Sequence, residues 1–169
     1  MMNVVVSGAF DDLRSREFRF LREASKLGEV HVVLWPDREI QAVTGKPPKL
    51  SQGERLYLLQ SVRYVQKVTV PCNLDIPDAI PEFESLSPRP QLWVVDEAAA
   101  TMQKKLFCEM HGLEYRVLAR DQLRGFPSES PGFNSVLPAR GKVVVTGCFD
   151  WFHSGHVRSF EEVSALGDL

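Results

Sequence analysis

The segment from residue 143 to residue 166 places the strongest constraint on what this chain can fold into. A short apolar run, Val143-Val144-Val145, is followed by a glycine-containing turn and then by apolar residues at helical spacing from Val157 to Leu166. This order predicts a strand, a tight turn and a helix. The turn exposes backbone N–H groups, and the helix dipole adds partial positive charge at the same point. The segment therefore predicts an anion site at the beginning of the helix.

The turn carries two histidines and a glycine. His153 and His156 are three residues apart in the first turn of the expected helix, so they occupy neighbouring positions on one face. Both side chains can reach the same phosphate chain, and Gly155 between them keeps the backbone open where a ligand comes close. The alternative interpretation is a helix-capping turn with two incidental histidines.

The ten residues Gly147-Cys148-Phe149-Asp150-Trp151-Phe152-His153-Ser154-Gly155-His156 resemble the signature of the nucleotidylyltransferase superfamily, a histidine–any–glycine–histidine motif after a strand. The Gly-Cys-Phe-Asp beginning is most similar to the cytidylyltransferase branch. The resemblance implies a Rossmann-like α/β fold with a doubly wound parallel sheet. It also implies CTP, or alternatively ATP, as a substrate, Mg2+ that bridges the phosphate oxygens, and a small phosphorylated acceptor.

The same resemblance implies roles for individual residues. His153 and His156 would be catalytic, because they would contact the triphosphate and stabilise charge in the transition state. Asp150 is expected to fix the turn, and no residue is assigned as a metal ligand. The residues expected to contact the nucleotide are Gly147, Cys148, Phe149, Ser154 and Gly155.

A second segment of the chain repeats this pattern. Residues 3–29 align with residues 142–168 at a constant offset of 139, with 12 identities in 27 positions and no gap. The shared residues of the first segment are Val4, Val5, Val6, Gly8, Phe10, Asp11, Ser15, Arg19, Glu23, Ser25, Leu27 and Gly28. Because the turn residues match as well as the apolar ones, we interpret the two segments as a tandem duplication.

The two copies differ in the turn. The first has Arg14, Arg16 and Glu17 where the second has His153, Gly155 and His156. Glu17 would repel a triphosphate, so we expect the first copy to keep the scaffold and to have lost the chemistry. The alternative is a different phosphate site built on the two arginines. The residues of this possible degenerate site are Gly8, Ala9, Phe10, Arg14, Lys46 and Arg55.

Strands that alternate with helices from residue 3 to residue 118 predict an α/β domain with a parallel sheet. The expected strands are residues 4–6, 31–35, 68–70, 91–95 and 115–118, and the expected helices are residues 18–27, 51–65, 79–86 and 98–111. Residues 36–50 are expected to form a loop, in which Lys46 resembles the lysine of a phosphate-binding loop. Gly28 and Gly112 are interpreted as helix ends.

Several side chains between the two copies carry separate expectations. Arg55 either reaches the nucleotide or forms a salt bridge on the helix surface. Asp96 and Glu97 either face a cleft at the carboxyl edge of the sheet or cap a helix, and capping is favoured. His31 is expected at a strand end. The expected exposed residues of the helix 98–111 are Lys104 and Lys105, and its expected core residues are Leu106, Cys108 and Met110.

The division into domains follows from the repeat. Residues 1–128 are expected to form a degenerate nucleotidylyltransferase-like domain, residues 129–140 a linker, and residues 141–169 the first strand and signature helix of a truncated second copy. One strand and one helix cannot bury a core of their own. We therefore expect a longer tandem protein. The alternatives are that residues 141–169 add their strand to the first sheet, or that two chains exchange these residues in a homodimer.

Composition narrows the class of protein. The formal net charge is -2 without a basic cluster, which argues against nucleic acid as the main partner. No apolar run approaches the ~20 residues of a membrane span, so membrane insertion is not expected. The three cysteines form no Cys-x-x-Cys pair, which favours reduced thiols and a cytoplasmic protein.

These observations together predict an enzyme that transfers CMP from CTP to a small phosphorylated substrate and releases pyrophosphate, with the chemistry in the second copy. This chain alone is expected to be inactive, because it lacks the later strands of that copy. Two alternatives remain open. The first copy could be a non-catalytic nucleotide-binding, regulatory or dimerisation module, or the enzyme could be an adenylyltransferase that uses ATP.

Overall fold

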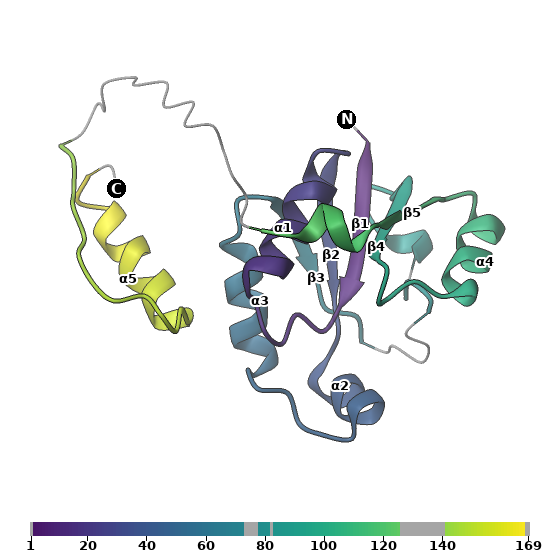
Figure 1. Cartoon of the computed structure of the whole chain (residues 1–169), viewed down its shortest axis with the longest axis horizontal. Helices are drawn as coiled ribbons and strands as arrows, with labels where there is room; N and C mark the ends of the chain where they lie inside the picture. Colours follow the sequence, from purple (N-terminus) through teal and green to yellow (C-terminus); the bar gives the residue numbers. More distant parts are fainter. Residues whose placement is uncertain (1, 73–77, 82, 126–140, 168–169) are drawn as a thin grey trace. The chain divides into compact units, whose positions relative to one another are not determined.

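The computed structural model describes residues 2–72, 78–81, 83–125 and 141–167 (Figure 1). The chain separates into two compact units, Met1–Pro127 and Ser128–Leu169, each of which is described by itself. The expected linker at residues 129–140 lies outside the described residues.

The first unit is built on a parallel sheet of five strands. The strands are β1 (Asn3–Gly8), β2 (Glu29–Leu34), β3 (Val65–Thr69), β4 (Leu92–Asp96) and β5 (Glu114–Leu118). Their order in the sheet is β3-β2-β1-β4-β5, and every neighbouring pair is parallel. The chain therefore runs outward from β1 to one edge, crosses back, and runs outward to the other edge. This confirms the expected doubly wound, Rossmann-like α/β fold.

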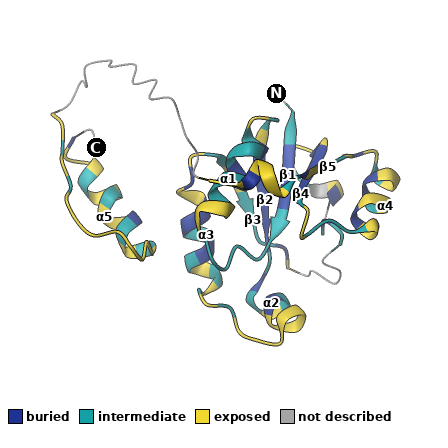
Figure 2. Cartoon of the chain, viewed as in Figure 1, coloured by how far each residue is buried: buried dark blue, intermediate teal, exposed yellow. Residues whose placement is uncertain are grey.

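Helices cover both faces of this sheet. They are α1 (Ser15–Ser25), α2 (Asp37–Thr44), α3 (Gln52–Gln60) and α4 (Met102–His111), with 3-10 turns at Phe83–Ser85 and Arg120–Leu123. Leu21 of α1 and Leu59 of α3 pack on one face, and Cys108 of α4 packs on the other. These helices carry both buried and exposed residues (Figure 2). The sheet thus forms the middle layer of three.

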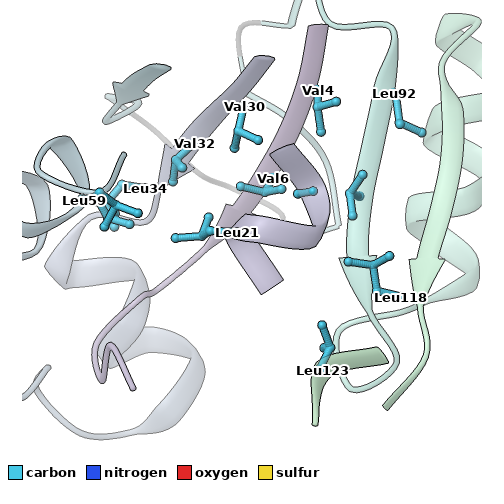
Figure 3. Packing of buried hydrophobic residues seen from close by; sticks show 13 residues of the cluster. Val4, Val6, Leu21, Val30, Val32, Leu34, Leu59, Leu92, Leu118 and Leu123 are labelled. Carbon is cyan, nitrogen blue, oxygen red and sulfur yellow. The ribbon is translucent and has the colours of Figure 1, made fainter. Parts of the chain in front are cut away.

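The buried side chains follow the alternation of a strand. Val4 and Val6 of β1 pack in one cluster with Leu21 of α1 and Leu59 of α3 (Figure 3). Val5 between them packs in the other cluster with Trp93 and Cys108. All three valines are 0% exposed because β1 is bordered by β2 and β4 and covered on both faces. This is the pattern expected for a central strand of a parallel sheet.

Several element boundaries differ from the expectation. The predicted loop at residues 36–50 contains α2, which ends at Gly45 in the left-handed conformation. The helix predicted at 51–65 stops at Gln60, because Val65 begins β3. The helix predicted at 79–86 is only the 3-10 turn Phe83–Ser85 among the residues that can be described there.

The helix α4 overturns the predicted assignment of its faces. It begins only after Thr101, whose hydroxyl caps the helix by accepting from Lys104 N. Lys104 is buried rather than exposed, whereas Leu106 and Met110 are 50% and 76% exposed rather than core. The prediction failed because periodicity does not tell which face of a helix meets the sheet, and here the inward face carries Cys108 and the partly buried Phe107 beside Lys104. Cys108 is buried as expected.

The second unit contains one helix, α5 (Ser154–Ser164), within its described residues. The expected strand at Val143–Val145 has no regular pairing there, and Val144 is 83% exposed. A strand is assigned from its hydrogen bonds to a neighbour, so an apolar run without a paired neighbour stays irregular. No helix in the described part of the chain is long and apolar enough to span a membrane.

Candidate functional site

The first turn of α5 holds both histidines of the motif by backbone hydrogen bonds. His153 is the N-cap residue, and its Nδ1 accepts from the Gly155 N–H at 3.0 Å. Nδ1 of His156 reaches back and accepts from the His153 N–H at 3.2 Å. Two free N–H groups at the helix beginning are thereby satisfied by imidazole nitrogens, in the manner of a capping box.

These two bonds determine which ring nitrogens remain for a ligand. A nitrogen that accepts a hydrogen bond carries no proton, so Nε2 carries the proton in each neutral imidazole. Nε2 of His153 and Nε2 of His156 are therefore donors, and the two rings lie 4.1 Å apart. A phosphate oxygen is a matching acceptor, and the helix dipole favours an anion at the same position.

Gly155 is required by the position of the His153 ring. A Cβ at residue 155 would lie 2.8 Å from Cε1 and 3.0 Å from Nδ1 of that ring. Any side chain at this position would push the ring off the Gly155 N–H. The glycine of the motif is therefore a packing requirement as well as an opening for a ligand.

Aromatic side chains hold the His156 ring from the other side. Phe152 stacks on it with ring centroids 5.5 Å apart, and Phe149 meets it edge-on at 5.4 Å. Phe160 of α5 contacts both phenylalanines. Of the other residues expected to contact a nucleotide, Gly147 and Cys148 are exposed and Ser154 is partly buried in the same turn.

The equivalent turn of the first unit is organised around an open pocket at the switch point of the sheet. Here the chain leaves β1 in one direction and β4 in the other, which is where open α/β sheets bind ligands. The pocket has a volume of about 370 Å3. Its lining residues are Ser7, Gly8, Phe10, Asp11, Asp12, Arg16, Glu17, Phe20, Lys49, Val95, Asp96 and Ala99.

Ion pairs cross this pocket. Arg16, which stands where the second unit has Gly155, lies 2.6 Å from an Asp96 carboxylate oxygen at the end of β4. Lys49 lies 2.8 Å from Asp12, which also pairs with Arg14 at 2.7 Å. The Arg14 guanidinium, and after it Lys49, lowers the pKa of the Asp12 carboxyl. Four carboxylates against two cations in the lining disfavour a triphosphate.

Glu17 has a structural role in this turn. Its carboxylate accepts from the Arg14 N–H at 3.1 Å, which is the bond that His156 makes to His153 in the second unit. The sequence comparison identified Glu17 only as a repelling charge. Its capping role could have been found from the spacing, because an acidic residue three positions after the N-cap is the usual partner in a capping box.

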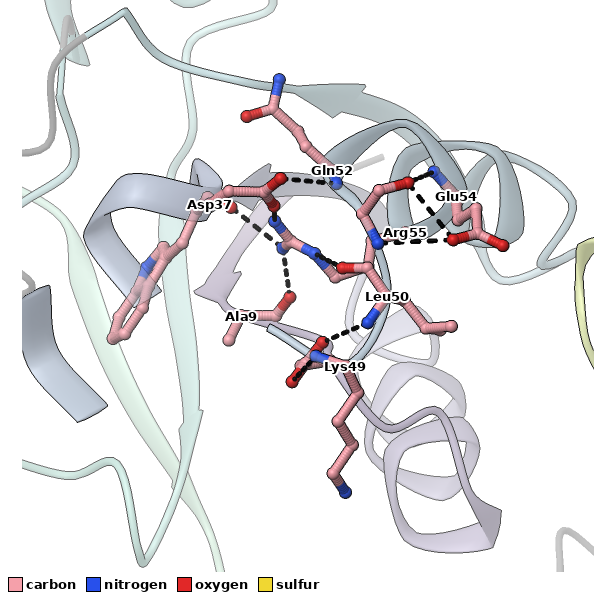
Figure 4. A network of polar contacts seen from close by, with 10 residues as sticks. Ala9, Asp37, Lys49, Leu50, Gln52, Glu54 and Arg55 are labelled. Carbon is pink, nitrogen blue, oxygen red and sulfur yellow. Dashed lines mark hydrogen bonds and ion pairs between the residues drawn. The ribbon is translucent and has the colours of Figure 1, made fainter. Parts of the chain in front are cut away.

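Arg55 lies in the interior of the first unit (Figure 4). Its side chain is 0% exposed, so the predicted surface salt bridge is wrong. The guanidinium donates to the carbonyl oxygens of Ala9, Trp35 and Leu50 and lies 2.6 Å from the Asp37 carboxylate. Arg55 thus ties the turn after β1 to the beginnings of α2 and α3.

Other residues of the possible degenerate site are also placed. Lys46 is exposed and does not line the pocket, whereas Lys49, which the sequence comparison missed, does. The Asp11 carboxylate accepts from the N–H groups of Lys49 and Leu50 at 2.8 and 3.0 Å, which positions this second lysine. Asp96 lines the pocket, which agrees with the predicted position at a cleft. The favoured helix-capping role is wrong, because its bond from the Ala99 N–H at 2.8 Å closes a turn and Thr101 caps α4.

Phe10 and Ala9 form the corner of this turn. Phe10 has a positive φ of 46° and lines the pocket, while Ala9 contributes its carbonyl to Arg55.

In the described residues no three His, Cys, Asp or Glu side chains form a group suited to a metal ion. A divalent ion at either turn would therefore depend on phosphate oxygens for most of its ligands.

Comparisons with known proteins identify relatives of one kind. The chain is 26% identical over 152 residues to an FAD synthase of Methanolacinia petrolearia, covering 88% of this chain and 94% of that protein. It is 33% and 34% identical over 70 residues to FAD synthases of Pyrococcus horikoshii and Pyrococcus abyssi, where it spans only 47% of each relative. No protein-family model matches the chain.

A solved structure shares the fold. The crystal structure of the lipopolysaccharide core biosynthesis protein from Thermoplasma volcanium superposes with a TM-score of 0.55 and 21% identity, over 70% of this chain and 95% of that one. This structure supports the Rossmann-like α/β fold of the chain, and the relative of comparable length is named FAD synthase.

Proposed function

We propose that the turn at residues 147–156 is the phosphate-binding and catalytic segment of a nucleotidylyltransferase. The observation that carries the proposal is the pair of imidazoles at the beginning of α5. Both are held through Nδ1, so both keep an Nε2–H donor for a ligand, and their ring centroids are 4.1 Å apart. The similarity to FAD synthases supports the same class of reaction.

In the proposed reaction, an oxygen of the acceptor phosphate attacks the α-phosphorus of a nucleoside triphosphate. A new P–O bond forms, the bond from the α-phosphorus to the bridging oxygen breaks, and pyrophosphate leaves with that electron pair. The attacking oxygen is already anionic, so no general base is required. His153, His156 and the N–H groups of α5 would stabilise the charge on the phosphates, and Mg2+ would enter with the triphosphate.

The relatives favour ATP as the nucleotide. FAD consists of FMN that carries an adenylyl group, so relatives named FAD synthase point to adenylyl transfer and to a flavin phosphate as the first acceptor to test. The expected use of CTP finds no support among them. We therefore propose ATP as the substrate and keep CTP as the alternative.

The domain organisation is also a proposal. We infer that the first unit and the turn at 147–156 are copies of one ancestral unit. The helices α1 and α5 begin and end at equivalent residues of the 139-residue offset. A Cβ at Gly28 would lie 2.0 Å from the Met2 carbonyl oxygen, and one at the equivalent Gly167 would lie 2.1 Å from that of Gly141. A shared close approach of this kind supports common descent.

The test is a pyrophosphate-release assay on the complete protein with ATP or CTP, and with FMN or glycerol 3-phosphate as the acceptor. We expect release that requires ATP, Mg2+ and a phosphorylated acceptor, and that fails in His153→Ala and His156→Ala. Release that is unchanged in both variants would contradict the site. Release that is larger with CTP would contradict the choice of nucleotide and leave the site standing.

A second function is supported for the first unit by the Arg16–Asp96 pair and by Glu17. The Arg16–Asp96 pair occupies the position where a triphosphate would lie, and the Glu17 carboxylate would repel its negative charge. The unit would therefore act as a non-catalytic module. Calorimetry with Mg·ATP on a His153→Ala/His156→Ala chain tests this directly. No binding is expected, and Mg2+-dependent binding would show that the first unit keeps a nucleotide site.

A further inference from the structure

The helix α4 has its polar and apolar residues on unexpected sides. Its buried side chains are Lys104 and Cys108, while Met102, Leu106 and Met110 are 66%, 50% and 76% exposed. The three exposed residues are spaced by four, so they form one stripe along the solvent side of the helix. Figure 2 shows exposed residues along this helix at the edge of the first unit.

The inward face of α4 carries Lys104 beside Cys108 and the partly buried Phe107, so Leu106 and the two methionines are left outside the core of the first unit. Lys104 Nζ donates to the Ala99 carbonyl at 2.6 Å, lies 3.8 Å from an Asp78 carboxylate oxygen and stands 5.9 Å from the Trp93 ring centroid. Burial lowers the pKa of Lys104, with the two nearby aspartates opposing that change. An amphipathic helix that served only its own core would place the leucine and methionines inward.

The charged residues beside the stripe are self-complementary. Lys105 and Glu109 lie on the same flank of α4, 57% and 60% exposed, and their charged atoms are 3.9 Å apart, which is too long for a hydrogen bond. If a second α4 packs antiparallel about a two-fold axis perpendicular to both helices, the same flanks face each other. Lys105 of one helix then lies near Glu109 of the other, and the reverse pair forms by symmetry.

We propose that the α4 stripe of Met102, Leu106 and Met110 is an interface between two copies of this chain, packed antiparallel with Leu106 near the two-fold axis. The apolar stripe supplies the buried centre, and the Lys105–Glu109 pairs at its rim set the antiparallel direction. This interface differs from an exchange of residues 141–169 and does not depend on the proposed chemistry.

The size of the surface sets the expected strength. One helix face from each copy is smaller than a standard interface, so the dimer should be weak, with a dissociation constant on the order of micromolar or above. The neighbouring strand β5 has a free edge within the described sheet and is the competing route to self-association. Changes confined to the outer face of α4 separate the two routes.

The test is sedimentation velocity of the full chain over a range of concentrations. We expect a monomer–dimer equilibrium that Leu106→Glu abolishes. Lys105→Glu and Glu109→Lys should each raise the dissociation constant about tenfold, because each places like charges together twice in the symmetric interface. The double variant Lys105→Glu/Glu109→Lys restores opposite pairs and should return the constant to the wild-type value.

Controls distinguish the interface from loss of fold and from the second unit. Circular dichroism checks that each α4 variant keeps its helix content. Leu166→Glu introduces the same change at an exposed leucine of the second unit and should leave the dimer intact. A chain that stays monomeric at all concentrations would overturn the proposal, and so would a dimer that is indifferent to Leu106→Glu or a double variant that fails to recover.

Discussion

The two segments 3–28 and 142–167 share the Gly-x-Phe-Asp residues of their turns. Both contain the helix that follows, but only the first contains a strand that is paired in a sheet. In the first unit Val5 is 0% exposed between β2 and β4, whereas the equivalent Val144 is 83% exposed. The helices and their caps form in both, with the same boundaries at the 139-residue offset. Local sequence is thus sufficient for the helix and its first turn, while the strand depends on neighbours far away in the chain.

Replacing the two histidines tests whether catalysis depends on the second copy and not on the first. His153→Ala and His156→Ala should each lower turnover of the complete protein at least about 100-fold, because each removes a donor to the developing phosphate charge. The matched changes Arg14→Ala and Glu17→Ala in the first unit should leave turnover unchanged. Steady-state pyrophosphate release measures all four. Equal losses in the two units would show that the first copy takes part in the reaction.

Adding a methyl group at the two equivalent glycines, Gly28 and Gly167, tests whether the first unit is more rigid at this contact than the second. Gly28→Ala should destabilise the first unit by about 3 kcal/mol, because its Cβ would collide with the carbonyl oxygen of Met2, which is held next to the buried central strand β1. Gly167→Ala meets the same contact with Gly141 but should cost under about 1 kcal/mol, because residues near 143 are free to shift. Urea unfolding followed by tryptophan fluorescence checks both, and equal costs would contradict the comparison.

Acid should weaken the first unit selectively. Burial, and after it Lys67, lowers the pKa of His31 on β2 from 6.5 to about 4. The native ring stays neutral while the unfolded chain takes up a proton, so the free energy of unfolding falls as pH drops from about 6.5 to about 4. The full effect is about 3 kcal/mol. His31→Gln should flatten this dependence, and His156→Gln, at the partly exposed histidine of the second unit, should not.

The smallest expected difference in stability is between variants of the equivalent aspartates Asp11 and Asp150 in the two turns. Asp11→Asn should cost about 1 kcal/mol in the first unit, since its carboxylate accepts from the N–H groups of Lys49 and Leu50. Asp150→Asn is the matched change in the exposed turn of the second unit and should cost less. Thermal unfolding of both variants measures the difference. A larger cost at Asp150 would indicate a partner for that carboxylate.

The sequence was sufficient to predict what depends on short-range patterns. The strand–helix alternation identified the parallel doubly wound sheet, and the helix expected from residue 51 does begin there, where Ser51 forms a capping box with Glu54. The pair of histidines at the beginning of α5 was likewise readable from spacing. In each case a few neighbouring residues determine the geometry, because the interactions involved span one helical turn.

Other features depended on contacts distant in the chain. Arg55 was expected either to reach the nucleotide or to form a surface salt bridge. In the structure, the carbonyl oxygens of Ala9, Trp35 and Leu50 converge on its buried guanidinium. Gly28 was interpreted as a helix end, but its constraint is the close approach of Met2, which directly precedes β1. The outward stripe of α4 could not be predicted from periodicity, which identifies an apolar face without telling which way it turns.

The bond from the third residue of the helix back to its N-cap has a consequence for how such a protein changes over generations. Glu17 and His156 satisfy the same backbone N–H with different side chains. A lineage can therefore exchange one for the other and lose the imidazole without losing the start of the helix. A copy that is no longer selected for catalysis would still fold after that exchange, and its surface would be free to evolve new binding functions.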